Sequence, residues 1–177
     1  INLMNAKFIL NYETKNIEEL KKIFAETYLF YSNYSKGIIM TIHSIEEQQG
    51  TLNGKKIIVR LDLDVPFKDG EVLDTARIER AKNTIDFLVQ EKAKIIIIAH
   101  AGRPKGKVVD DLSLSFLPPV LKNLWGYDVS FCDETIGDKP QKAANDLESG
   151  QILLLENLRF HAGEEANDPA FSKALSK

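Results

Sequence analysis

The chain has 177 residues, a formal net charge of −3, a hydrophobic fraction of 44% and a charged fraction of 28%. This length suits one α/β domain with a real core, and the charge balance provides no basic face for a nucleic acid. No apolar run approaches the ~20 residues of a membrane span, and the first residues lack the pattern of a secretory signal peptide. The composition therefore favours an ordinary globular domain without a nucleic-acid or membrane partner.

The chain contains a single cysteine, Cys132, which closes a short apolar run. One cysteine cannot form an internal disulfide, so a reducing compartment and a cytoplasmic location are expected. We interpret Cys132 as a core residue rather than a reactive thiol.

Residues 1–39 differ in composition from the rest, being rich in Asn, Tyr, Lys and Ile, and they carry no recognisable chemistry. One short amphipathic helix is predicted there from four apolar residues: Ile17, Leu20, Ile23 and Phe24. The chain begins with Ile1, which suggests a fragment or a reading frame opened upstream of the true start. We interpret Met40 as a natural start, 1–39 as an extension of unknown order, and 40–177 as the domain.

Strands and helices alternate along the domain. A β-branched run predicts a strand over 57–61, and a helix is expected to follow the potential caps Asp74 and Thr75. Five residues share one face of that helix: Ile78, Ala81, Ile85, Leu88 and Val89. A second strand is predicted over 94–99, and its almost unbroken isoleucine run suits a strand covered on both faces.

The second half of the domain continues this alternation. A helix is predicted over 113–124, with Pro118 and Pro119 in its first turn or at a break. A third strand over 128–132, a weak helix over 139–147, a fourth strand over 152–155 and a helix from 169 to 177 follow. The alternation predicts a three-layer α/β/α Rossmann-like domain with a mostly parallel sheet.

Polar residues follow three of the predicted strands. Ligands of open parallel sheets bind beyond the carboxyl ends of the strands, which meet at one edge. Each polar cluster taken alone is explained by the polarity of loops, but three at one edge favour a ligand site. The clusters are Asp62 and Asp64; His100, Gly102 and Arg103; and Glu156, Asn157, Arg159 and His161.

Arg77 gives an independent indication of an anion site. It falls in the first turn of the predicted helix, where a cation opposes the positive end of the helix dipole. It is either a solvated side chain or a group that faces, together with the helix amides, a phosphate or carboxylate. With Arg103, Arg159 and His100 it would suit a small, multiply anionic substrate.

Other chemistries fit the sequence poorly. The glycines of G-R-P-K-G-K (102–107) are one residue too close for a phosphate-binding P-loop, and Val108 stands where Ser or Thr should hold magnesium. The His and Cys positions lack zinc spacing, and the D-x-D pair at 62–64 is a weak metal signal. No metal site is predicted.

Four segments resemble signatures of the phosphoglycerate kinases, in the family's order and spacing. V-R-L-D-L-D-V-P (59–66) is similar to V-R-x-D-x-N-V-P, and D-T-A-R-I (74–78) to the D-x-x-R-I helix start. A-H-A-G-R-P-K-G (99–106) is similar to the S-H-x-G-R-P-x-G loop, and L-L-L-E-N-L-R-F-H (153–161), with G-E-E (163–165) and N-D-P (167–169), to the L-L-E-N-L-R-F segment and its sequel.

This resemblance implies reversible phosphoryl transfer between 1,3-bisphosphoglycerate and ADP in glycolysis, by a monomeric two-domain enzyme that uses Mg-ATP and Mg-ADP as co-substrates. Residues 40–177 would be part of the amino-terminal domain, which binds 3-phosphoglycerate, and the nucleotide-binding domain would be absent. Arg77 would lie near the transferring phosphoryl group as the catalytic residue. The implied substrate-binding residues are Asp62, Leu63, Asp64, Arg77, His100, Ala101, Gly102, Arg103 and Arg159, with Gly102 letting the backbone approach the ligand.

Two departures from the family pattern bear on function. Asp64 stands where the family usually has Asn, and an ionised carboxylate only accepts hydrogen bonds and repels an anion. The nucleotide-binding elements lie beyond Lys177, so the chain alone is expected to be inactive. A truncated, non-catalytic domain that binds a phosphorylated metabolite or nothing is the alternative, and a generic Rossmann-like domain is a third interpretation.

Overall fold

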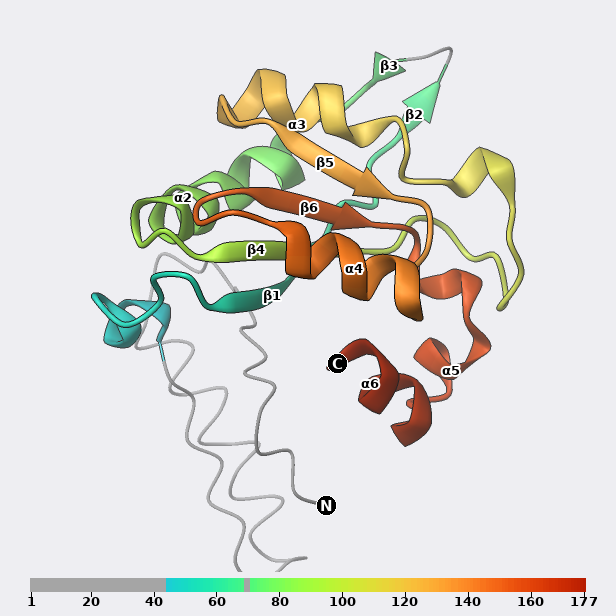
Figure 1. Ribbon diagram of the computed structural model, residues 1–177. Coiled ribbons are helices and arrows are strands. Elements are labelled where there is room, and N and C mark those ends of the chain that lie inside the picture. Colours follow the sequence, from blue (N-terminus) through green and yellow to red (C-terminus); the bar gives the residue numbers. More distant parts are fainter. Residues whose placement is uncertain (1–43, 69–70) are drawn as a thin grey trace, which may run out of the picture. The chain divides into compact units, whose positions relative to one another are not determined.

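The computed structural model describes residues 44–68 and 71–177, and those from Gln48 to Lys177 belong to one compact unit (Figure 1). A 3-10 helix, η1 (Ile45–Gln48), is the first described element. The predicted extension over 1–39, its short helix and Met40 lie outside the described residues.

Four parallel strands form the central sheet of this unit. They are β1 (Lys56–Arg60), β4 (Lys94–Ile98), β5 (Val129–Cys132) and β6 (Ile152–Leu155), in the spatial order β1-β4-β6-β5. Each coincides with a predicted strand to within a residue at either end. The last strand in the chain, β6, therefore lies between β4 and β5.

Helices cover both faces of the sheet, as Figure 1 shows, with α2 and α3 on one side and α4 on the other. Their bounds are α2 (Ala76–Gln90), α3 (Leu117–Trp125) and α4 (Asp138–Asp146). Two helices follow β6: α5 (Ala162–Glu165) and α6 (Pro169–Leu175). The predicted three-layer α/β/α arrangement with a parallel sheet is confirmed.

The isoleucine run of β4 is buried on both faces, because successive side chains of a strand point to opposite sides. Ile96 and Ile98 belong to an apolar cluster with β6 side chains, and Phe171 and Leu175 of α6 pack against it. Cys132, predicted to be a core residue, is a buried free thiol in the same cluster.

The opposite face is closed by α2 and α3. The predicted face of α2 is correct: Ile78, Ala81, Ile85 and Leu88 are buried, while Val89 is half-buried. The Trp125 indole Nε1 donates a hydrogen bond to the carbonyl oxygen of Ile78 at 2.9 Å, which ties α3 to the start of α2.

The helix predicted over 113–124 differs at its start, because α3 begins at Leu117 rather than at Ser113. The residues before it are anchored to the end of β6: the Leu114 N–H donates to Glu156 Oε1 at 2.8 Å, and Ser113 Oγ donates to Glu156 Oε2 at 2.7 Å. Pro118 and Pro119 fall in the first helical turn, where no backbone N–H is needed for the helix.

The short elements of the described chain are absent from the prediction, because each is too short to show a periodic pattern. They are η1, α5, a two-stranded antiparallel ribbon, β2 (Phe67–Lys68) with β3 (Glu71–Val72), and the 3-10 helices η2 (Asp110–Leu112) and η3 (Leu158–Phe160).

Candidate functional site

Three loops meet at the carboxyl edge of the sheet, where the sequence predicts a ligand site. They follow β1, β4 and β6. Backbone hydrogen bonds hold them side by side beyond the strands: the Leu61 N–H donates to the Ile98 carbonyl and the Leu158 N–H to the Ala99 carbonyl, both at 3.0 Å. The predicted polar clusters therefore lie on adjacent loops.

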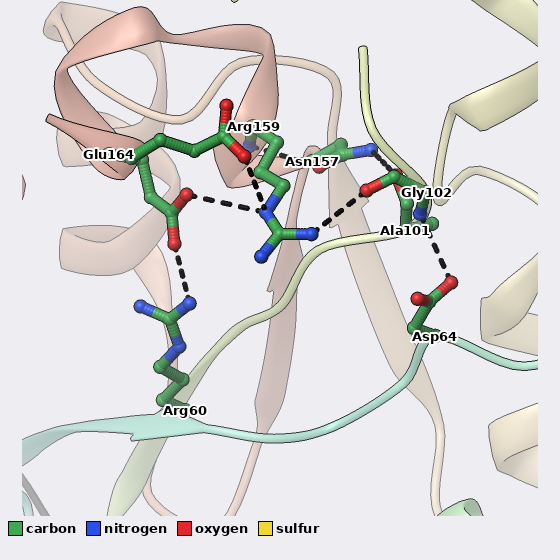
Figure 2. A network of polar contacts seen from close by, with 8 residues as sticks. Arg60, Asp64, Ala101, Gly102, Asn157, Arg159 and Glu164 are labelled. Atoms are coloured by element: carbon green, nitrogen blue, oxygen red, sulfur yellow. Dashed lines mark hydrogen bonds and ion pairs between the residues drawn. The ribbon is translucent and has the colours of Figure 1, made fainter. Parts of the chain in front are cut away.

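Asp64 and Gly102 join the first loop to the second. Asp64 Oδ1 accepts a hydrogen bond from the Gly102 N–H at 3.0 Å (Figure 2). Gly102 has φ of +61°, and a Cβ atom there would lie 2.8 Å from Cδ2 of Leu112. The positive φ favours glycine at this position whatever ligand approaches it, and a larger residue would also require the Leu112 methyl groups to shift.

Arg77 is held against the first loop from the first turn of α2. Its Nη1 donates to Asp62 Oδ1 and to the Asp64 carbonyl, each at 3.0 Å, and its side chain stays 48% exposed. Asp74 Oδ1 accepts from the Ala76 N–H, the first of α2, at 2.9 Å, while the N-cap residue itself is Thr75, whose side chain makes no capping bond. Asp62 and Asp64 lie in the loop after β1, since residues 61–66 are not a strand.

Arg159 crosses from the third loop to the second. Its Nη1 donates to the Gly102 carbonyl at 3.0 Å, while its Nε faces Glu164 Oε2 at 3.5 Å and Glu165 Oε1 at 3.7 Å (Figure 2). Gly102 therefore connects Asp64 and Arg159 through its two backbone polar groups.

A buried amide fixes the loop geometry from below. Asn157 is fully buried, and its Nδ2 donates to the carbonyls of Ala101 at 2.8 Å and Leu112 at 2.9 Å. Its Oδ1 accepts from the Arg159 N–H at 3.0 Å. With all three bonds made, Asn157 acts as a structural clamp, and its buried neighbour Glu156 is likewise satisfied.

His100 is half-buried beside these groups, and its Nδ1 is buried without a hydrogen-bond partner among the described residues. Burial lowers the pKa of the imidazole, and the Arg159 guanidinium lowers it further. In the absence of a ligand His100 is therefore neutral at pH 7, so only the arginines of the expected basic patch carry a formal charge.

The remaining predicted residues divide into two kinds. Leu63 and Ala101 are buried, so only their backbone groups are available to a ligand. Arg103 is exposed and forms no ion pair within the described part of the chain. No ion pair therefore links it to the residues around Gly102.

Three residues of this network, Arg60, Glu164 and Glu165, are absent from the predicted site. Arg60, at the end of β1, donates from Nη2 to Glu164 Oε1 at 2.5 Å. Glu164 belongs to the quoted G-E-E segment, and Arg60 to V-R-L-D-L-D-V-P, but neither pattern indicates that their side chains meet.

In residues 44–68 and 71–177 no group of three or more His, Cys, Asp or Glu side chains is placed to hold a metal ion. Within the same residues no helix is both long enough and apolar enough to cross a bilayer.

Fold and site together define a Rossmann-like α/β domain with an arginine-bearing polar site at the carboxyl edge of its parallel sheet. A family model described as phosphoglycerate kinase matches residues 47–177, which is most of the chain. The chain belongs to the phosphoglycerate kinase family.

Known proteins agree with this assignment. The chain is similar to the phosphoglycerate kinase of Sinorhizobium fredii, at 51% identity over 123 residues that make up 70% of this chain and 31% of that protein. It is 46% identical over 130 residues to the enzyme of Maricaulis maris, covering 73% of this chain and 32% of the relative. The solved phosphoglycerate kinase of Pyrococcus horikoshii aligns with a TM-score of 0.66 at 28% identity, covering 76% of this chain and 34% of that structure.

The chain spans about a third of the length of these relatives. The family and the fold are therefore established for the part of the chain that matches.

Proposed function

We propose that this chain carries the 3-phosphoglycerate-binding part of a phosphoglycerate kinase. The observation that supports it most directly is the convergence of Arg77 and Arg159 on the loops joined by Asp64 and Gly102. Each guanidinium is anchored through one Nη atom, and each keeps a second Nη without a hydrogen bond to the described residues. An arginine with one Nη bonded to the protein can donate from the other Nη to the phosphate or carboxylate oxygens of a ligand.

The site residues take roles that follow from their exposure. Arg77, on the exposed rim, would face the transferring phosphoryl group and stabilise charge on its oxygens. The unpartnered Nδ1 of His100 is available to a ligand oxygen. The remaining proposed contacts come from Asp62, Asp64, Arg103 and Arg159 and from the backbone of Leu63, Ala101 and Gly102.

The protein that contains this domain would move a phosphoryl group between 1,3-bisphosphoglycerate and ADP. Mg-ATP or Mg-ADP would bind outside the residues of this chain, and the active protein would be a cytoplasmic monomer. Phosphoryl transfer requires both substrates and the metal ion to be aligned. The 177 residues alone are therefore proposed to bind the acceptor substrate without catalysing turnover.

Titration calorimetry of the full 177-residue chain with 3-phosphoglycerate tests this proposal. Binding is expected in the wild type, with a loss of about 30-fold or more in Arg159→Ala, because a desolvated charge partner is removed. Lys142→Ala is the matched control, since Lys142 is an exposed cation of α4 that pairs with Asp146 four residues on. Equal losses in both variants, or no binding by the wild type, would contradict the proposal.

A further inference from the structure

One carboxylate joins two arginines that come from different strand ends. Glu164 Oε1 lies 2.5 Å from Arg60 Nη2, and its Oε2 lies 3.5 Å from Arg159 Nε (Figure 2). The Glu164 side chain is only 9% exposed, whereas the nearby Glu165 is 46% exposed. Glu164 is thus a shielded bridge rather than a solvated surface charge.

This bridge leaves one edge of the Arg159 guanidinium, the one that carries Nη2, without a hydrogen bond to the described residues. The Nε faces the carboxylates, Nη1 is bonded to the Gly102 carbonyl, and Nη2 makes no hydrogen bond to a described residue. The buried Nε makes no hydrogen bond, so the plane of the guanidinium is held by one hydrogen bond, through Nη1, and by the ion pair of Nε with Glu164. Its free edge therefore points in one direction before a ligand arrives, which reduces the side-chain freedom that binding must remove.

We propose that Glu164 is a positioning residue that, held in place by Arg60, aims the free edge of Arg159 at a phosphorylated substrate. The inference rests on the proposed function, since it assigns Arg159 to the binding of 3-phosphoglycerate. Arg60 acts as the counter-cation that keeps Glu164 beside Arg159 and away from the incoming anion.

Positioning and simple electrostatics predict opposite effects. A carboxylate near an anion site repels the ligand, so its neutralisation alone strengthens binding. Loss of the carboxylate instead removes the ion pair that holds the Nε side of Arg159, which frees the guanidinium and weakens binding. Glu164→Leu and Glu164→Gln remove the same charge from a side chain of similar size, but only Gln keeps an acceptor for Arg159 Nε.

The experiment compares these two variants with the wild type in the full chain. Calorimetry with 3-phosphoglycerate is expected to show affinity about 10-fold weaker for Glu164→Leu, as for other supporting residues, and an intermediate affinity for Glu164→Gln. The Arg159 Nε–H resonance in ¹⁵N NMR spectra is expected to broaden in Glu164→Leu, while the backbone amide signals of β4 and β6 keep their positions. A purely structural role would move those backbone signals as well.

Arg159→Ala separates this inference from the proposed function. If Arg159→Ala binds as tightly as the wild type, the proposed function fails and the inference fails with it. If Arg159→Ala loses affinity but both Glu164 variants bind as well as the wild type or better, only the inference is overturned. If Glu164→Leu does not fold, an unchanged affinity and a sharp Arg159 Nε–H signal in Arg60→Gln, which removes the counter-cation, would overturn it.

Discussion

Asp64 is predicted to weaken the binding of 3-phosphoglycerate, and Asp64→Asn is predicted to strengthen it. Asp64 uses Oδ1 to accept from the Gly102 N–H at 3.0 Å, and an asparagine Oδ1 retains that bond. The bond fixes the amide orientation, so Nδ2 replaces the other carboxylate oxygen and offers a donor. The substitution therefore changes charge and donor count while it preserves the loop contact.

The size of the effect follows from the position of Asp64, which is half-buried at the solvent-facing edge of the sheet. Two unit charges about 6 Å apart at an effective dielectric constant of about 60 interact by about 1 kcal/mol. That energy corresponds to roughly fivefold in affinity.

Titration calorimetry of wild type and Asp64→Asn at low and at high ionic strength measures this difference. The gain should shrink as salt rises, because mobile ions screen the repulsion. Asp146→Asn serves as the control, since Asp146 ends α4 shortly before β6 begins, at the opposite edge of the sheet. Equal affinity of wild type and Asp64→Asn at low salt would refute the reasoning, because it would show that the carboxylate does not face the ligand.

Three further predictions concern neighbouring residues. Arg77→Ala is expected to weaken binding of 3-phosphoglycerate by about 2–4 kcal/mol in calorimetry, and an unchanged affinity would remove Arg77 from the site. Gly102→Ala is expected to lower the free energy of unfolding by about 2 kcal/mol in guanidinium chloride titrations. The alanine would have a positive φ, and its Cβ would lie 2.8 Å from Leu112 Cδ2. An unshifted unfolding midpoint would contradict this prediction. Because the folded-state pKa of His100 is lowered, the neutral ring favours the folded state above pH ~6.5, and that stability is lost as pH falls through the folded-state pKa. His100→Gln should flatten the stability profile below pH ~6.5, and a profile identical to wild type would show that His100 does not contribute.

The sequence is sufficient to predict the strands and the covered faces, because periodicity and burial are local properties of the chain. The isoleucine run of β4 and the apolar face of α2 are examples. The start of α3 was placed too early, because Glu156 lies more than forty residues away and holds Ser113 and Leu114 in the loop. No local pattern reports such a contact.

The site residues show the same division between local and non-local information. The position of Arg77 in the first turn of α2 was predictable from the cap residue before it. The neutral state of His100 depends on burial and on Arg159, and the bridge through Glu164 depends on the end of β1 meeting α5. Both effects arise only when distant segments pack together.

The position of β6 has a consequence for the order in which the domain acquires its structure. In a chain made from its amino terminus, β4 and β5 are complete before β6. They do not pair with each other, because β6 lies between them in the sheet. The Asn157 clamp and the Arg159–Gly102 bond follow β6 in the chain, so they form only after this strand has inserted. Non-local pairing of this kind is slow relative to helix formation. A ribosome-bound intermediate that ends before β6 would leave the backbone N–H and C=O groups that β4 and β5 direct toward β6 unpaired, and it would contain no Arg159 contact with the β4 loop.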